Sequence, residues 1–139
     1  MPTHLGHRIL PCLLVTDMRR SLEFYAELLG FTQTGYYPIE SEPIRTEVRR
    51  DDIAIILYTE PVHSQDQAPS FTGALYVFPE SIDRVADELR GKVPFAWGPE
   101  DTEFDIREFA IRDPDGYTIV FAERVKSPRS ETASPAVNT

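Results

Sequence analysis

The side chains best suited to nucleophilic chemistry are few in this chain, and the first to consider is its single cysteine, Cys12. Its surroundings are apolar and hold no adjacent histidine, whereas a reactive thiol normally lies beside a basic group. A buried structural cysteine is therefore favoured over a nucleophile. The sequence shows no Ser-His-Asp grouping with credible placement and no glycine-rich phosphate loop. Covalent catalysis and phosphoryl transfer thus have little support.

The charge of the chain restricts its partners. The formal net charge is −9 and the sequence pI is about 4.7. Proteins that bind nucleic acids concentrate Lys and Arg, so this balance argues against that class. An acidic surface favours cationic ligands, although the need for solubility alone would also account for it.

The length and the apolar pattern indicate a cytoplasmic protein without a membrane segment. The 139 residues are enough for one domain with a real core. No apolar run approaches the roughly 20 residues that span a bilayer. The N-terminal apolar stretch is short and broken by Pro11, unlike a signal peptide. A single cysteine cannot form an internal disulfide, which fits the cytoplasm.

Two helices and one tight hairpin are the clearest elements that would position functional residues. Asp113-Pro114-Asp115-Gly116 separates two apolar-rich runs with strong turn chemistry. Apolar residues at i, i+3, i+4 and i+7 predict a helix from Met18 to Leu29, for which Asp17 is the N-cap. A second helix shows the same spacing 60 residues later. The two expected core faces are Leu22, Tyr25, Ala26 and Leu29, and Ile82, Val85, Ala86 and Leu89.

The order of elements indicates an internal duplication. Strands are expected at 10–15, 31–37, 44–50, 53–59, 71–78, 95–97, 107–112 and 117–123, with an acidic loop at 98–103. Each half then reads β-α-β-β-β, and one half is too small to bury its sheet alone. The sequence therefore predicts an α+β fold of two βαβββ modules that form a curved mixed sheet with the helices outside. A single domain is expected at 1–124, with module one at 8–59, a linker at 60–70, module two at 71–124 and a flexible tail at 125–139.

This pattern resembles the vicinal oxygen chelate superfamily, which includes glyoxalase I, extradiol dioxygenases, fosfomycin-resistance enzymes and bleomycin-resistance proteins. The resemblance lies in PCLLVTDMRRSLEFYAELLGF (11–31), RRDDIAIILYT (49–59), SIDRVADEL (81–89) and REFAIRDPDGYTIVFAE (107–123). Through its last segment and the Phe-Tyr pair of its first helix, the chain looks most similar to the bleomycin-resistance branch.

The resemblance implies four positions where metal-dependent members place His, Gln or Glu ligands. They lie on the first and fourth strands of each module. Strand alternation puts them at Leu10, Ile56, Ala74 (Gly73 after a one-residue slip) and Val120. None of these side chains binds a metal. His7 falls on the wrong side of the pleat, and His4 and His63 fall in expected loops. We therefore expect no metal and no other cofactor.

The resemblance also implies binding without catalysis. The expectation is a homodimer that sequesters a bulky small organic molecule, with cationic compounds among the candidates, in a cleft between subunits. Trp97 and Phe104 flank the acidic segment, where related proteins place stacking residues. Tyr36 and Tyr76 also fall near the expected cleft, although aromatic residues favour strands in any protein. The expected ligand-binding residues are Cys12, Leu14, Tyr37, Thr46, Ile56, Tyr58, Trp97, Phe104, Glu108 and Val120.

Two alternative functions and one alternative role for a residue stay open. The first function is a metal-dependent glyoxalase-like lyase, isomerase or dioxygenase whose ligands lie elsewhere in the chain. The second is a non-catalytic structural or sensory module whose cleft is filled by its own side chains. Glu108 is the only acid expected on a cleft-facing strand position, and pairing with Arg45 or Arg112 is an alternative to ligand binding.

Overall fold

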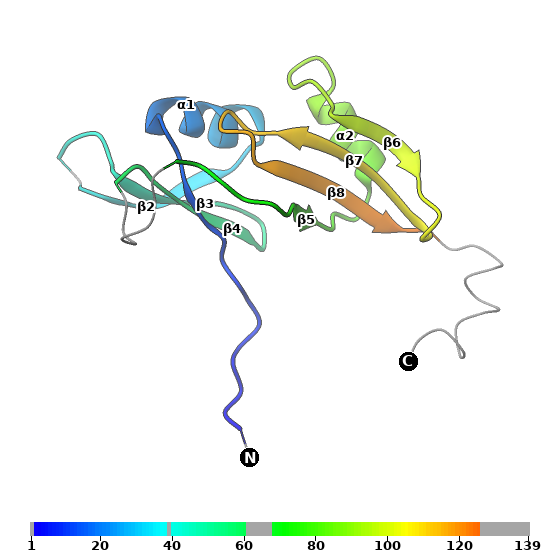
Figure 1. Ribbon diagram of the computed structural model, residues 1–139, viewed down its shortest axis with the longest axis horizontal. Helices are drawn as coiled ribbons and strands as arrows, with labels where there is room; N and C mark the ends of the chain where they lie inside the picture. The colour runs from blue at the N-terminus through cyan, green and yellow to red at the C-terminus, as the bar shows by residue number, and fades with distance from the viewer. Residues whose placement is uncertain (1, 39, 61–67, 126–139) are drawn as a thin grey trace. The chain divides into compact units, whose positions relative to one another are not determined.

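The chain folds into two compact units, which divide between Ser70 and Phe71. The computed structural model describes residues 2–38, 40–60 and 68–125 (Figure 1). The expected tail falls almost wholly outside the described residues, as does much of the expected linker. Within the described residues, no helix is long and apolar enough to cross a membrane.

The first unit contains one four-stranded mixed sheet. Its strands are β1 (Cys12–Leu14), β2 (Thr32–Tyr37), β3 (Arg45–Arg50) and β4 (Ile53–Tyr58). They are ordered β1-β4-β3-β2, with β1 parallel to β4 and the other pairs antiparallel. The turn from β3 to β4 lies at the expected Asp51-Asp52, where Asp51 has a positive φ of 53°.

The helix expected from Met18 is present, but its second half is wider than an α-helix. α1 (Met18–Leu22) begins at Asp17, whose carboxylate accepts a hydrogen bond from the Arg20 amide at 3.1 Å. It continues as the π-helix η1 (Glu23–Leu28), which ends with the Leu29 amide bonded to the carbonyl of Phe24, five residues back. The wider turn brings Phe24 into the core, whereas the predicted core residues Leu22 and Ala26 are only half-buried.

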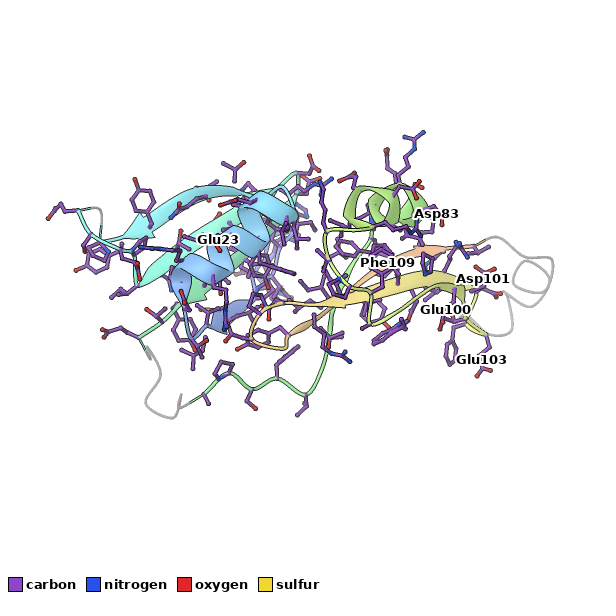
Figure 2. All side chains as sticks on the ribbon, turned by 90° about the horizontal axis from the view of Figure 1, so that it is seen from above. Glu23, Asp83, Glu100, Asp101, Glu103 and Phe109 are labelled. Atoms are coloured by element: carbon purple, nitrogen blue, oxygen red, sulfur yellow. The ribbon has the colours of Figure 1, made fainter. Side chains whose placement is uncertain are left out.

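The helical segment of module one covers a single face of its sheet, as Figure 2 shows. The buried residues on this face are Leu13, Val15, Val48, Ile55 and Leu57. They occupy alternate positions along their strands, as residues that share one sheet face must, and Leu14, Ala54 and Tyr58 on the opposite face are buried as well. The opposite face is free of helix and is called here the open face of module one.

The second unit repeats this topology. Its strands are β5 (Leu75–Val77), β6 (Trp97–Asp101), β7 (Ile106–Arg112) and β8 (Thr118–Arg124), and its helix is α2 (Ile82–Leu89). The sheet order is β5-β8-β7-β6, with β5 parallel to β8. Each strand therefore occupies the place of its counterpart in module one. The predicted α+β fold of two βαβββ modules is confirmed.

The second helix matches the sequence pattern closely. Its N-cap is Ser81, whose hydroxyl accepts a hydrogen bond from the Arg84 amide at 3.3 Å. The predicted core face of Ile82, Val85, Ala86 and Leu89 is fully confirmed, because all four residues are buried. Phe109 on β7, labelled in Figure 2, is also buried and stacks on Phe121 with a centroid distance of 5.1 Å.

Two strand boundaries differ from the sequence prediction. β5 begins at Leu75 and is shorter than the expected 71–78. The acidic loop expected at 98–103 is largely strand, because Gly98 to Asp101 belong to β6, in which Glu100 and Asp101 pair with β7. Gly98 adopts a positive φ of 80° at a shift in register, and this bend lets the strand continue beyond Trp97.

The final hairpin follows its turn chemistry. The Asp113 carboxylate accepts hydrogen bonds from the amides of Asp115 and Tyr117, at 2.9 and 3.0 Å. Gly116 takes the positive φ that the turn requires. The hairpin pairs β7 with β8, and β7 carries Glu108.

Candidate functional site

The strand register places two rows of side chains on the open face of module one. One row runs across the sheet through Cys12, Ile56, Glu47 and Gly35. The next contains Leu14, Tyr58, Arg45 and Tyr37. Cys12 and Leu14 thus lie opposite Leu13 and Val15, as strand alternation predicts. Leu14 and Tyr58 are nevertheless buried, and Ile56 is half-buried.

A pocket of about 260 Å³ lies at the β2 side of this sheet. We call it the tyrosine pocket; it is lined by Gly35, Tyr36, Tyr37, Arg45, Thr46, Glu47 and Ile56. Three of the predicted ligand-binding residues therefore meet here: Tyr37, Thr46 and Ile56. Their contact with a ligand stays a prediction.

The hydroxyl of Thr46 is already engaged within the sheet. It donates to the backbone carbonyl of Gly35 at 2.7 Å and accepts from the side-chain amide nitrogen Nε2 of Gln33 at 2.9 Å. Its side chain is buried. Because a hydroxyl has one proton to donate, Thr46 holds the edge strand in place and has no second donor for a ligand.

Cys12 is exposed, so its expected burial was wrong. It begins the edge strand β1 on the face that no helix covers, and this position outweighs the apolar character of its neighbours. Its partner in the sheet is Ile56, which lines the tyrosine pocket.

The sheet face of module two opposite Phe109 and Phe121, called here the open face of module two, contains a buried carboxylate bonded to two aromatic residues. Glu108 on β7 is only 9% exposed. Its carboxylate accepts a hydrogen bond from the indole N–H of Trp97 at 2.9 Å and a long one from the Tyr76 hydroxyl at 3.5 Å. Val120 lies in the same row as Tyr76 and Trp97, because β8 pairs with β5 and β7 pairs with both β8 and β6.

Apolar side chains share the sheet face of this carboxylate, because Ala122 pairs with Glu108 and Ala110 lies two residues further along β7. Ala110, Val120 and Ala122 are buried together, and Ala74, Trp97 and Ile106 pack against them. We call Tyr76, Trp97, Glu108 and Val120 the Glu108 patch. Burial and then the negative charge of Glu108 raise the pKa of the Tyr76 hydroxyl, which keeps it protonated as a donor.

Within module two, the carboxylate of Glu108 has the neutral donors Trp97 and Tyr76 as hydrogen-bond partners, and among the described residues of this module no ion pair joins it to Arg112. The alternative pairing with Arg112 was therefore wrong. Pairing with Arg45, which belongs to the other unit, stays a prediction. Glu108 is also not the only acid on an open-face position, because Glu47 lies in the same row as Ile56.

The acidic segment lies next to this patch. Glu100 pairs directly with Glu108 across β6 and β7, so that two carboxylates are cross-strand neighbours. Figure 2 shows Glu100, Asp101 and Glu103 gathered at one end of module two. Asp101 is paired with Arg107 at 3.2 Å. Phe104, expected to bind a ligand, is 74% exposed in the turn between β6 and β7.

Metal ligands do not gather at the positions that the family resemblance implies. Of Leu10, Ile56, Ala74 and Val120, none has a ligating side chain, and Ile56 and Val120 lie on the open faces. Among residues 2–38, 40–60 and 68–125, no three His, Cys, Asp or Glu side chains come together in a way that could hold a metal ion. His4 and His7 are exposed and contact each other, with ring centroids 5.1 Å apart. His63 lies outside the described residues.

Two components of these sites were not among the predicted ligand-binding residues. Tyr76 reaches Glu108 only because β5 and β7 flank β8, which is a long-range pairing. Arg45 lies between Tyr37 and Tyr58 in its row for the same reason. Their aromatic and basic character is visible in the sequence, but their neighbours are set by strand register.

A protein-family comparison matches residues 4–121 to the Glyoxalase/Bleomycin resistance protein/Dioxygenase superfamily. Among curated proteins, none matches the sequence.

Solved structures share the fold at low sequence identity. TioX from Micromonospora sp. ML1 has a TM-score of 0.74 and 15% identity, covering 86% of this chain and 100% of its own. TnmS3, an antibiotic binding protein from Streptomyces sp. CB03234, has a TM-score of 0.68 and 21% identity, covering 88% and 99%. Virulence protein STM3117 from Salmonella typhimurium has a TM-score of 0.66 and 23% identity, covering 88% and 100%.

Proposed function

Because this chain belongs to the Glyoxalase/Bleomycin resistance protein/Dioxygenase superfamily, we propose that it binds a small organic molecule without a metal and without catalysis. The proposed ligand carries a cationic group that docks at the Glu108 patch. The apolar side chains at the four implied metal positions support a role without a metal. The description of its structural neighbour TnmS3 as an antibiotic binding protein supports a bulky, drug-like ligand.

The observation that carries this proposal is the environment of the Glu108 carboxylate. It is nine-tenths buried, and its hydrogen-bond partners Trp97 and Tyr76 are both neutral. A buried charge without a counter-ion costs free energy. Glu100 adds a second negative charge directly across the strand, and like charges in that position repel. A bound cation would relieve both penalties.

Aromatic side chains supply the rest of the proposed contact. Trp97 and Tyr76 flank the carboxylate, and a cation over an aromatic ring gains about 0.5–2 kcal/mol. Micromolar affinity needs roughly −8 kcal/mol, so apolar burial must provide most of the binding free energy. At about 25 cal/mol per Å², some 300 Å² of buried apolar surface would provide it before the entropic cost of association.

We further propose that the protein is a homodimer and that its ligand cleft involves both subunits. Large side chains that remain exposed support this assembly, notably Tyr37, Tyr76, Phe78 and Phe104. Exposed apolar groups of this size are typical of surfaces that meet a partner.

The test uses copper-free bleomycin as the cationic, bulky probe. We expect the melting temperature of the full chain to rise with probe concentration, as mass action requires. Glu108→Gln keeps an acceptor for Trp97 but removes the charge, and we expect it to weaken binding about tenfold, measured by calorimetry. Glu80→Gln removes one charge at an exposed position outside the patch and serves as the matched control.

Three results would contradict the proposal. Near-stoichiometric Zn, Ni, Mn or Fe in protein purified without a histidine tag would favour the metal-dependent lyase, isomerase or dioxygenase. An unchanged melting temperature at millimolar probe would argue against drug binding and favour the structural or sensory module. Equal weakening by Glu108→Gln and Glu80→Gln would show that net charge, and not the Glu108 patch, attracts the probe.

A further inference from the structure

The tyrosine pocket differs from the Glu108 patch in the sign of its charge. Arg45 lines this pocket, and among the described residues its guanidinium has no ion-pair partner. The other charged residue of the lining, Glu47, is already neutralised. Its carboxylate accepts from the Arg49 guanidinium at 3.1 Å and from the Thr34 hydroxyl at 3.2 Å. The uncompensated charge at this pocket is therefore positive.

The register places Arg45 between aromatic rings. Tyr37 pairs with Arg45 on one side and Tyr58 on the other, and paired residues project from the same face. Tyr58 is buried, whereas Tyr37 is 65% exposed and lines the pocket with Arg45. A guanidinium in this position offers planar, forked donors that match a carboxylate.

Gly35, which lines the same pocket as Arg45, leaves open space in it. A Cβ added at this residue would meet no atom within 4 Å, so the missing side chain leaves the pocket open. The volume of about 260 Å³ is slightly below the range typical of drug-sized ligands. It therefore fits a single ring with one small substituent.

We propose that the tyrosine pocket binds the carboxylate of an aromatic acid, with the anion on Arg45 and the ring beside Tyr37 and Ile56. This site goes beyond the proposed cation site and is independent of Glu108. The net charge of −9 does not oppose it strongly, because salt at physiological strength screens exposed charges beyond about 8 Å. The positive charge of Arg45 then decides whether the pocket prefers an anionic or a cationic ligand.

Three probes of nearly equal size test which ligand charge the pocket prefers: anionic benzoate, neutral benzamide and cationic benzamidine. We would titrate each into the isotopically labelled full chain at pH 7 and follow backbone amide shifts by NMR. We expect benzoate to perturb the amides of Tyr36, Tyr37 and Thr46. Its affinity should exceed that of neutral benzamide about fivefold, the gain typical of one exposed ion pair. Cationic benzamidine should leave these amides unchanged.

Two variants and one control locate the interaction. Arg45→Gln should reduce benzoate affinity to that of benzamide. Arg112→Gln removes the same charge from an exposed position in module two and should change nothing. Gly35→Val adds a branched side chain to the pocket lining at a position where a Cβ meets no atom within 4 Å, and it should abolish binding of both benzoate and benzamide. An unchanged melting temperature would show that each variant is folded.

The outcomes separate this inference from the proposed function. Benzoate binding that survives Arg45→Gln, or benzamidine binding at least as tight as benzoate, would overturn the anion site. Shifts confined to amides outside residues 35–37 and 45–47 would also overturn it. Glu108→Gln should leave benzoate binding intact, so a failure of bleomycin binding would not affect this result.

Discussion

At the scale of single residues, Arg107 connects three elements of module two. Its guanidinium bonds to Asp83 on α2 at 3.0 Å and to Asp101 on β6 at 3.2 Å, while Arg107 itself lies on β7. The labelled Asp83 and Asp101 can be located in Figure 2. The hydrogen bonds from Arg107 hold the pKa of the Asp83 carboxyl below its ordinary value of 3.8. This ion pair therefore contributes to stability only while Asp83 is ionised.

The pH dependence of stability follows from the direction of that pKa shift. A lowered pKa in the folded state gives stabilisation that is present above pH 3.8 and is lost as the pH falls through the lowered value. We expect Asp83→Asn to lower the melting temperature by about 1–3 °C at pH 7. The difference from wild type should shrink below pH 3.8, measured by thermal melts across pH 2.5–7.

Asp87→Asn is the matched control for this measurement. Asp87 pairs at 2.6 Å with Arg90, the residue that caps the end of the same helix, and so joins no separate elements. Its substitution should affect the melting temperature less at pH 7. If Asp83→Asn lowered the melting temperature equally at pH 2.5 and pH 7, the loss could not come from the ion pair between Asp83 and Arg107.

At the scale of elements, the pairing of β6 with β7 holds the Glu108 patch together. Trp97 reaches Glu108 from β6, and the bend at Gly98 follows immediately. A Cβ at Gly98 would overlap the carbonyl oxygen of Glu108 and lie 2.8 Å from the Cα of Phe109. Both atoms belong to the backbone of β7 and cannot rotate away.

Gly98→Ala is therefore expected to separate these strands. We predict a loss of about 3 kcal/mol or more in the free energy of unfolding, measured by chemical denaturation. Gly91→Ala is the matched control, because Gly91 has a similar φ of 87° but no atom within 4 Å of an added Cβ. It should cost only about 1 kcal/mol, from backbone strain alone. If both substitutions lowered the free energy of unfolding equally, backbone strain at positive φ would account for the loss at Gly98, and the close approach of β7 would not.

Local signals account for the elements that the sequence predicted well. α2 has a capping serine and a regular apolar spacing, and the last hairpin has Asp113 and Gly116 at its turn. The π-helix η1 and the extension of β6 were missed, because each depends on contacts made after folding. A segment as polar as Gly98 to Asp101 becomes strand only through its pairing with β7.

The candidate site was predictable in part for the same reason. Strand alternation correctly placed Cys12 and Ile56 on the face opposite Leu13. It could not reveal that Tyr76 would reach Glu108, since that contact depends on which strands are neighbours. Nor could it reveal that Arg49, and not Arg45, would neutralise Glu47.

At the scale of the whole molecule, the exposed aromatic side chains bear on assembly. We predict a solution mass of about twice the 15.8 kDa of one chain, measured by light scattering coupled to gel filtration. Phe78→Ser should shift the equilibrium toward monomer without unfolding the chain, because Phe78 is 57% exposed and outside both sites. A mass of 15.8 kDa at every concentration tested would contradict the homodimer.

The exposed position of Cys12 makes the molecule suited to direct optical observation. It is the single thiol of the chain, so a maleimide dye would attach at one place only. Its sheet partner Ile56 lines the tyrosine pocket, which brings the label close to that pocket but not into its lining. The native sequence thus already provides a unique position for a fluorescent reporter, with no engineered cysteine and no residue to remove.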